Sequence, residues 1–448
     1  MRTSLQPDEL LERASRLRRE NLAFARAFPG EGGARQPVHT VYGGAQLFRS
    51  DSTGKLGAVA LRALEEYAPE PAALVEALGI PAALADAVHG RVLEKLRREP
   101  VEDFRIDFED GYGNRPDAEE DGHAVSVAGE VAAGMGAGTL PPFLGIRVKP
   151  LNEELRGRSI RTLDLFLTAL AEATGGALPG GFVVTLPKIT IPEQVDFFAG
   201  VLETLEPRLG LERGALRFEL MVETPQAIIG PDGRCGLPEM VRAGGGRITG
   251  AHFGTYDYTA GVGITAAHQH MRHRACDFAR HAMQVALAGT GVWLSDGSTT
   301  VMPVPVHRAA PGGPPLTAAQ RADNRAGVHR AWKQHYDDVR HSLVHGFYQG
   351  WDLHPAQLVT RYAAVFAFFL ESVDSAGARL RNFVDKAAQA TLVGDVFDDA
   401  ATGQGLLNYF LRGINCGAVT EDETLAMTGL TLDELRGRSF LKILENRR

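Results

Sequence analysis

Short apolar runs alternate with helical patterns along most of the chain. Eight runs have the length of buried strands and are bounded by Gly, Pro or charged residues that mark turns. These runs are Val38–Tyr42, Phe104–Phe108, Phe143–Arg147, Phe182–Leu186, Leu216–Val222, Arg247–Phe253, Gly291–Leu294 and Phe347–Leu353. Helical spacing of apolar residues marks the segments between them, which include Leu56–Tyr67, Arg161–Ala173, Pro192–Leu205, Ala275–Ala288, Arg321–Val344 and Pro355–Leu370. Strand and helix alternating eight times predict an α/β fold, a (β/α)₈ TIM barrel rather than an open sheet.

Three segments lie outside this minimal barrel. An amphipathic helix is predicted over Pro7–Phe28, and a Pro/Gly-rich loop at 303–316 lengthens the connection before the last strand. We divide the chain into a catalytic barrel domain, residues 1–375, and a helical C-terminal lid or extension, residues 376–448. Within the extension the pattern predicts a helix over Arg381–Leu392 and short helices from Gly403 onward.

Composition and charge limit the classes of function. A length of 448 residues suits a barrel of about 250 residues with additions. The net charge of -8 provides no basic surface for nucleic acid and disfavours anionic membranes. Three scattered cysteines without CxxC spacing indicate a reducing compartment. With no signal-like or membrane-length apolar segment, the expected location is the cytoplasm.

Charged residues stand at the ends of the predicted strands, one strand after another. In a barrel the carboxyl ends of all strands converge on one face, where active sites of this fold lie. Each residue alone is an ordinary turn or cap residue, but the series favours a site on that face. Its members are Asp107, Glu109, Asp110, Arg147, Lys188, Glu223, Asp257, Asp296 and His354.

Glu223 and Asp257 follow two neighbouring buried strands and are the candidate metal ligands. An unpaired buried carboxylate is costly, and two close together repel unless a cation lies between them. A few hard oxygen ligands, with room for water and substrate, suit Mg²⁺, with Mn²⁺ as an alternative. The other interpretation is that each acid pairs with a loop Arg or Lys, or caps the next helix.

Six motifs at successive strand ends resemble a known family. Over about residues 100–395, DFEDGYG, IRVKPL, LPKITIPEQ, MVETP, FGTYDYTAG and GWDLHPAQ are similar to citrate lyase β-subunit-like and malyl-CoA lyase proteins. These belong to the HpcH/HpaI aldolase group of the phosphoenolpyruvate/pyruvate barrel superfamily. The resemblance implies that Glu223 and Asp257 bind Mg²⁺ and that Arg147 is catalytic. It also implies a lid Asp, here Asp385, that acts in the neighbouring subunit of a homo-oligomer, a trimer or hexamer.

Other residues receive supporting roles in this interpretation. Lys188 is either a Schiff-base lysine or, as we favour, the partner of Glu109 or Asp107, and Asp107 is expected to be structural. Residues expected to contact the substrate or to orient the groups that do so are Glu109, Asp110, Lys149, Gly254, Thr255, Asp296 and His354. The chain departs from the family at Lys149-Pro150, where the CoA enzymes have Asn, and at Asp110, where the hydroxy-oxo-acid aldolases have His.

The expected function is therefore Mg²⁺-dependent cleavage or formation of a carbon–carbon bond through a metal-stabilised enolate. The substrate is expected to be a small 2-oxo or hydroxy acid, and whether it is used as a CoA thioester stays open. Two alternatives remain: a hydrolase or phosphotransferase acting on a pyruvate-like compound at the same metal site, and a barrel that binds a ligand without catalysis.

Overall fold

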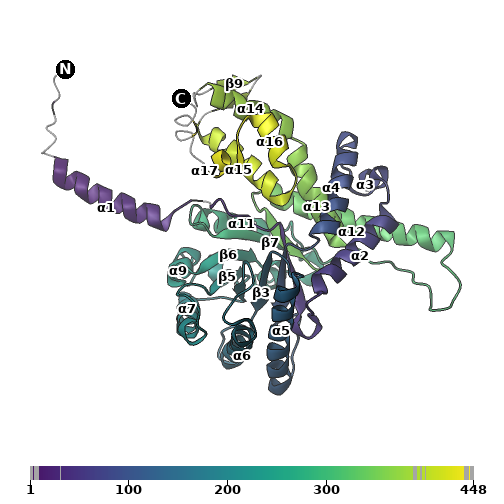
Figure 1. The fold of residues 1–448 in the computed structure, drawn as a ribbon, viewed down its shortest axis with the longest axis horizontal. Helices are drawn as coiled ribbons and strands as arrows, with labels where there is room; N and C mark the ends of the chain where they lie inside the picture. The colour runs from purple at the N-terminus through teal and green to yellow at the C-terminus, as the bar shows by residue number, and fades with distance from the viewer. Residues whose placement is uncertain are drawn as a thin grey trace.

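The computed structural model describes residues 10–30, 32–386 and 400–437, together with residues 4, 391–393, 396–398 and 443. Within these residues, eight parallel strands close into a barrel that is surrounded by helices (Figure 1). The strands are β1 (His39–Gly44), β2 (Asp103–Asp107), β3 (Phe143–Arg147), β4 (Val183–Leu186), β5 (Arg217–Val222), β6 (Ile248–Phe253), β7 (Trp293–Ser298) and β8 (Gln349–Asp352). Val41 of β1 lies opposite both Phe104 of β2 and Asp352 of β8, which closes the ring. The predicted TIM barrel and its eight strands are confirmed.

Helices connect the strands and cover the barrel. They are α1 (Leu11–Ala27), α2 (Ser52–Tyr67), α3 (Pro71–Leu78), α4 (Ala85–Arg98), α5 (Asp117–Ala137), α6 (Arg156–Thr174), α7 (Pro192–Arg208), α8 (Pro225–Ile228), α9 (Leu237–Ala243), α10 (Thr255–Gly261), α11 (Arg274–Leu287), α12 (Ala318–Val344), α13 (Gln357–Leu370), α14 (Val373–Asp385), α15 (Ala400–Cys416), α16 (Glu421–Thr428) and α17 (Leu432–Gly437). In the described part of the chain, no helix combines the length and apolar character needed to cross a bilayer.

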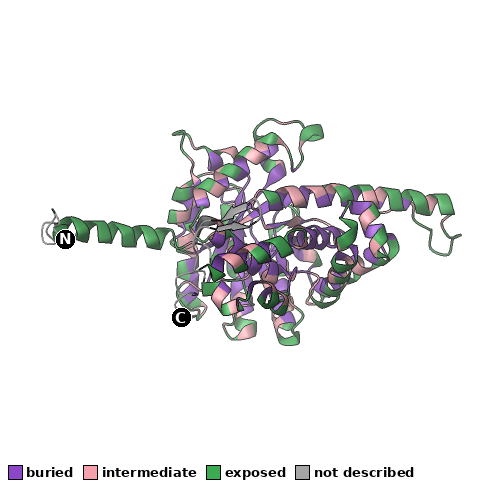
Figure 2. Ribbon diagram, turned by 90° about the horizontal axis from the view of Figure 1, so that it is seen from above, coloured by how far each residue is buried: buried purple, intermediate pink, exposed green. Residues whose placement is uncertain are grey.

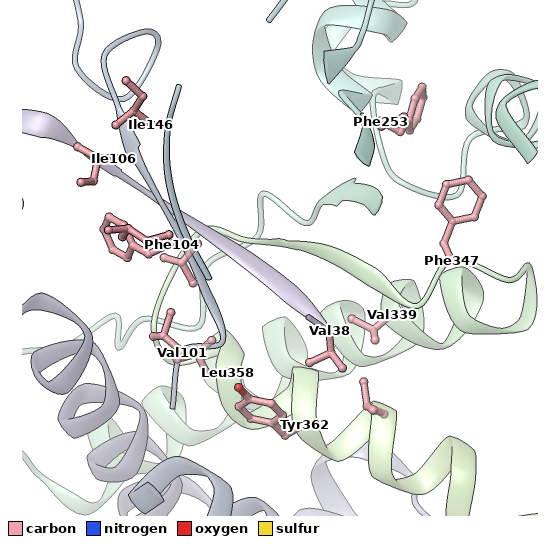
Figure 3. Packing of buried hydrophobic residues seen from close by; sticks show 14 of the residues in the cluster. Val38, Val101, Phe104, Ile106, Ile146, Phe253, Val339, Phe347, Leu358 and Tyr362 are labelled. Atoms are coloured by element: carbon pink, nitrogen blue, oxygen red, sulfur yellow. The ribbon is translucent and has the colours of Figure 1, made fainter. Parts of the chain in front are cut away.

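The strands place apolar residues outward, against the helices. In β2 the buried residues Phe104 and Ile106 alternate with charged residues, so that the apolar side chains share one face of the strand. Figure 3 shows part of this outer layer, in which strand residues such as Ile106 form one cluster with Val339 of α12 and Tyr362 of α13. The main hydrophobic core therefore lies between barrel and helices, and Figure 2 shows the buried residues at the centre of the molecule.

The barrel interior holds ion pairs where TIM barrels usually hold branched apolar side chains. Arg105 donates from Nε to Glu219 Oε1 at 2.8 Å and from Nη2 to Oε2 at 3.0 Å, and it also pairs with Asp103. Thr40 Oγ1 donates to Asp103 Oδ2 at 2.9 Å, and His252 Nε2 lies 2.9 Å from Glu219 Oε2. Burial alone would raise the pKa of Glu219, but Arg105 and His252 hold it well below its usual value. These strands are thus joined by charges that are shared across the barrel.

The C-terminal helices have a small core of their own. Leu380, Leu407, Phe410, Leu430 and Leu435 form a second apolar cluster, separate from the main core. The cluster packs beside the end of α13, where the rings of Phe369 and Tyr409 lie 5.2 Å apart (Figure 1).

The structure corrects the predicted helix Arg381–Leu392. Helix α14 ends at Asp385, and Thr391–Val393 (β9) pairs antiparallel with Val396–Asp398 (β10). The physical reason is visible in the sequence, because two β-branched segments separated by two residues, Gly394-Asp395, are typical of a β-hairpin. The helical spacing of apolar residues up to Leu392 led to the prediction of a helix instead of this hairpin.

Replacing Arg105 by Met is expected to destabilise the fold strongly. The variant leaves Glu219 and Asp103 buried without their cation, a change that typically lowers the free energy of unfolding by about 3–5 kcal/mol. Chemical denaturation measures the change. The control is Arg213→Met, which removes an exposed ion pair of 2.7 Å to Glu203 and should change stability by less than about 1 kcal/mol. Equal stability of the two variants would contradict the role given to the interior ion pairs.

Candidate active site

Strand-end residues meet at the carboxyl end of the barrel, around a cavity of about 350 Å³. Its lining includes Lys188 after β4, Glu223 after β5, and Asp257 in the first turn of α10, directly after β6. Two of the predicted strand-end acids and the predicted lysine therefore share one cavity.

Glu223 is buried, and the backbone shapes the space for its carboxylate. Its Oε1 accepts a hydrogen bond of 2.8 Å from the Lys188 backbone N–H. A Cβ at Gly254 would lie 2.4 Å from Glu223 Cβ and 2.5 Å from its Oε2, so only glycine fits there. Burial, together with the charges of Asp257 and Glu109, raises the pKa of Glu223 to about 8, although Lys188 opposes the shift.

Lys188 is the cation around which the acids gather. Its Nζ contacts Glu109, lies 3.1 Å from Asp110 Oδ2, and lies 3.8 Å from Asp257 Oδ2. Burial lowers the pKa of Lys188, but Glu223, Glu109 and Asp110 more than offset this and hold the pKa above its usual value. Such a lysine keeps its proton, so the geometry favours an ion pair over a Schiff-base nucleophile.

The backbone of Lys188 is strained. Its φ is 49°, the one positive φ of a non-glycine residue in the described part of the chain. That conformation costs on the order of 1–3 kcal/mol and persists only where the surroundings enforce it. Here the N–H is fixed by Glu223 and the ammonium by Glu109, so the strained conformation lets the backbone and the side chain of one residue bind two different acids of the cluster.

Arg147 lies below this cavity, at the end of β3. It donates to Asp107 from Nε at 2.7 Å and from Nη2 at 2.5 Å, while Nη1 lies 2.9 Å from Glu109 Oε2. Asp107 also accepts from the backbone N–H groups of Glu109 and Gly111. The guanidinium is therefore locked by Asp107, and Nη1 is the end directed toward the acids.

The acids outnumber the cations in this cluster. Five carboxyl groups surround two cations, so full ionisation would leave three negative charges in excess; the acids are Asp107, Glu109, Asp110, Glu223 and Asp257, and the cations are Arg147 and Lys188. A divalent cation on Glu223 and Asp257 would reduce this excess. No group of three or more potential metal ligands stands ready-made among the described residues, so such an ion would complete its shell with water or ligand oxygens.

The sequence model of DUF6986, described as a domain of unknown function, matches residues 17–443. The chain belongs to the DUF6986 family. No protein of curated function matches the sequence.

Several solved structures are similar to this DUF6986 chain. It is similar to a citrate lyase from Burkholderia xenovorans LB400, with a TM-score of 0.59 and 16% identity over 89% of this chain and 97% of that one. It is also similar to protein CitE from Mycobacterium tuberculosis in complex with magnesium, acetoacetate and coenzyme A, with a TM-score of 0.46 and 14% identity over 86% and 99% of the two chains. A Haloferax volcanii malate synthase gives a TM-score of 0.45 and 13% identity over 91% and 99%. The first of these likenesses shows a shared fold.

Other predicted site residues of the DUF6986 chain lie outside the cavity. Lys149 Nζ pairs with Glu120 at 2.7 Å and donates to the Phe108 carbonyl at 2.5 Å, and Thr255 Oγ1 donates to Met271 Sδ. His354 Nδ1 accepts from the Ala356 backbone N–H in the loop after β8.

Two of the predicted residues differ more in position. Strand β7 runs to Ser298 rather than ending at Leu294, so Asp296 lies within it and binds Arg280 of α11 and Ser342 of α12. Asp385 is exposed at the end of α14. Its predicted role in a neighbouring subunit stays a prediction.

Tyr42 and Trp351 are neighbours of Arg147 that the sequence analysis did not single out. Their rings lie 4.3 Å apart, and the guanidinium lies 4.9 Å from the Tyr42 ring and 5.5 Å from the Trp351 ring. Tyr42 Oη and Trp351 Nε1 are buried without a hydrogen-bond partner among the described residues. The alternation of side chains along β1 could have identified Tyr42. It stands two residues after Thr40, so both side chains face the barrel interior.

Replacing Gly254 by Ala is expected to displace Glu223. The new Cβ would overlap the carboxylate, which should lower the free energy of unfolding by about 1–3 kcal/mol and weaken divalent-cation binding. Denaturation and calorimetric titration measure the two effects. The control is Gly157→Ala in α6, where nothing lies within 4 Å of the added atom and the helix should gain stability slightly. Unchanged cation binding in the Gly254 variant would show that Glu223 is not a ligand.

Proposed function

We propose that this protein is a Mg²⁺-dependent carbon–carbon lyase, or the reverse condensing enzyme, that acts on a small 2-oxo or 2-hydroxy acid. The observation that carries the proposal is that Glu223 and Asp257 line one cavity at the carboxyl end of the barrel beside Lys188. Glu223 Oε1 accepts from the Lys188 backbone N–H, Asp257 Oδ2 lies 3.8 Å from the Lys188 ammonium, and Arg147 pairs with the neighbouring Glu109. The fold shared with a protein named as a citrate lyase is in keeping with it. The motifs at the strand ends add a similarity to the citrate lyase β-subunit-like and HpcH/HpaI proteins.

The donor set fits a hard divalent cation. Glu223 and Asp257 would hold it, since they are carboxylates in a cluster with excess negative charge, and Gly254 leaves room for the Glu223 oxygens. When bound, Mg²⁺ supplies Lewis acidity and a template for the carboxylate and keto oxygens of an oxo acid.

The chain's own residues then position and stabilise charge. Arg147, fixed by Asp107, places Nη1 beside Glu109 and would neutralise negative charge that develops on a carbonyl oxygen there. Lys188 keeps Glu109 and Asp110 oriented beside it. Asp385, exposed at the end of α14, is our candidate for the proton-transferring acid, reaching the site from a neighbouring copy.

Turnover should require both acids and the metal. We expect Glu223→Gln and Asp257→Asn each to lower kcat/KM by about a hundredfold, equivalent to about 3 kcal/mol of lost transition-state stabilisation. The assay follows product formation from pyruvate, oxaloacetate or glyoxylate, with and without acyl-CoA donors, before and after chelation of the metal.

The matched control is Glu203→Gln, which changes an exposed acid paired with Arg213. It should retain wild-type activity. Turnover that survives chelation, or that survives in both acid variants, would exclude the proposed reaction.

Lys188→Met should make divalent cations bind more tightly. The ammonium lies 3.8 Å from Asp257 Oδ2, one of the two carboxylates that the metal would use, and near a protein surface two unit charges 4 Å apart interact by about 4 kcal/mol. Removing that competing charge should raise Mg²⁺ affinity at least tenfold in calorimetric titration. Lys333→Met, which removes an exposed pair with Asp337, is the control. Unchanged or weaker binding would show that Lys188 and the metal occupy different positions.

A further inference from the structure

Helix α1 packs little against the part of the chain that the structure describes. None of its residues is buried, and it projects from the rest of the molecule as an arm (Figures 1 and 2). The large apolar residues Leu17 and Phe24 are 60% and 64% exposed. An isolated helix of this length is marginal in water, and most helices are stabilised by packing an apolar face.

Most of the large apolar residues of the arm lie on one face, which we call the stripe; Leu11 and Leu22 lie off it. The residues of the stripe recur at alternating spacings of four and three residues, which places them on one face of the helix. They are Leu10, Ala14, Leu17, Asn21, Phe24 and Phe28. Ser15 and Leu22 lie on the opposite face. The stripe therefore presents a surface for packing that this chain leaves open.

An unfilled apolar groove begins where the arm ends. A cavity of about 1,050 Å³ lies at the amino ends of the barrel strands, on the side opposite the candidate active site. Phe143, Phe182, Ile248 and Trp293 contribute to its walls, and Phe28 at the base of the arm contributes to one side. Its inner end reaches the interior ion pair of Arg105 and Glu219. On its rim, Val285 of α11 is 82% exposed. Within the described residues, an amphipathic helix with an exposed apolar stripe thus lies next to a largely apolar, unfilled groove.

We propose that the arm of one copy of this chain fills the groove of a second copy, so that two copies exchange arms. The interface is independent of the proposed lyase function. It uses residues at the other end of the barrel and predicts an assembly whatever reaction the site performs.

The available area is sufficient for a stable assembly. The four large residues of the stripe, Leu10, Leu17, Phe24 and Phe28, are between 40% and 64% exposed. Their exposed surface together equals about two whole side chains, on the order of 400 Å². Two arms and two matching grooves would bury on the order of 1,600 Å², the typical size of a specific interface.

Charge favours another copy over an anionic membrane. Residues 11–27 contain five Arg and two Glu, a net charge of +3, so the remaining residues carry -11 of the chain's total of -8. The basic arm is attracted by the body of a second copy, whereas that body would be repelled by an anionic bilayer.

Sedimentation velocity of the full-length chain over a range of concentrations tests the proposal. The wild type should have at least twice the mass of one chain. The arm variant Leu17→Asp/Phe24→Asp and the groove variant Val285→Asp should each be monomeric. Because these residues are exposed, circular dichroism should show an unchanged fold. The control Ser15→Asp/Leu22→Asp adds the same charge on the opposite face of α1 and should assemble like the wild type.

Mixing the two monomeric variants distinguishes the occupants of the groove. The groove variant keeps an intact arm and the arm variant keeps an intact groove, so the mixture should form mixed assemblies that neither variant forms alone. Three results would overturn the proposal. A monomeric wild type would mean that the arm does not bind a second copy, as when it folds onto its own groove. A groove variant that still assembles, as when two α1 helices pair with each other, or a wild-type monomer that sediments with anionic vesicles, would assign the arm to another occupant.

Discussion

Inside the barrel, Arg105 of β2 binds Glu219 of β5 as well as Asp103 of its own strand. Arg147 of β3 binds Asp107 of β2 and Glu109, which follows that strand. Buried charges are stable only when each has its partner, so these contacts fix the relative positions of β2, β3 and β5. The apolar core packs against the outer side of the strands, whereas these ion pairs join the strands from within the barrel. The geometry at the carboxyl end of the barrel follows, since Arg147 sets the place of Asp107 and Glu109, and Glu109 binds Lys188.

The fold and the location of the site could be predicted because both depend on local patterns. Apolar runs of strand length between helical segments are sufficient to indicate a barrel, and barrel topology then brings every strand end to one face. Glu223, Asp257, Lys188 and Arg147 were found in this way, from their positions after apolar runs. The same reasoning placed Asp296 at a strand end, and it failed there because β7 continues through a polar stretch whose side chains bind α11 and α12.

Pairing across the barrel could not be predicted. Nothing in the sequence says that Arg105 binds Glu219 rather than Asp107, because the choice depends on strand register and on which residues face inward. The positive φ of Lys188 was equally hidden, since non-glycine residues adopt it only when tertiary contacts impose it. Helix α1 was predicted as amphipathic, but a pattern of apolar residues does not reveal what covers them.

Lys188 also limits how the stability of this protein can be increased. Lys188→Gly would relieve the strained backbone, since glycine adopts this φ without cost, but it would leave the buried Glu109 and its neighbour Asp110 without the ammonium that pairs with them. The strain and the ion pairs belong to one residue, so removing the first also removes the second. Thermostabilisation of the barrel should therefore leave residue 188 untouched, because the lost ion pairs would outweigh the relieved strain.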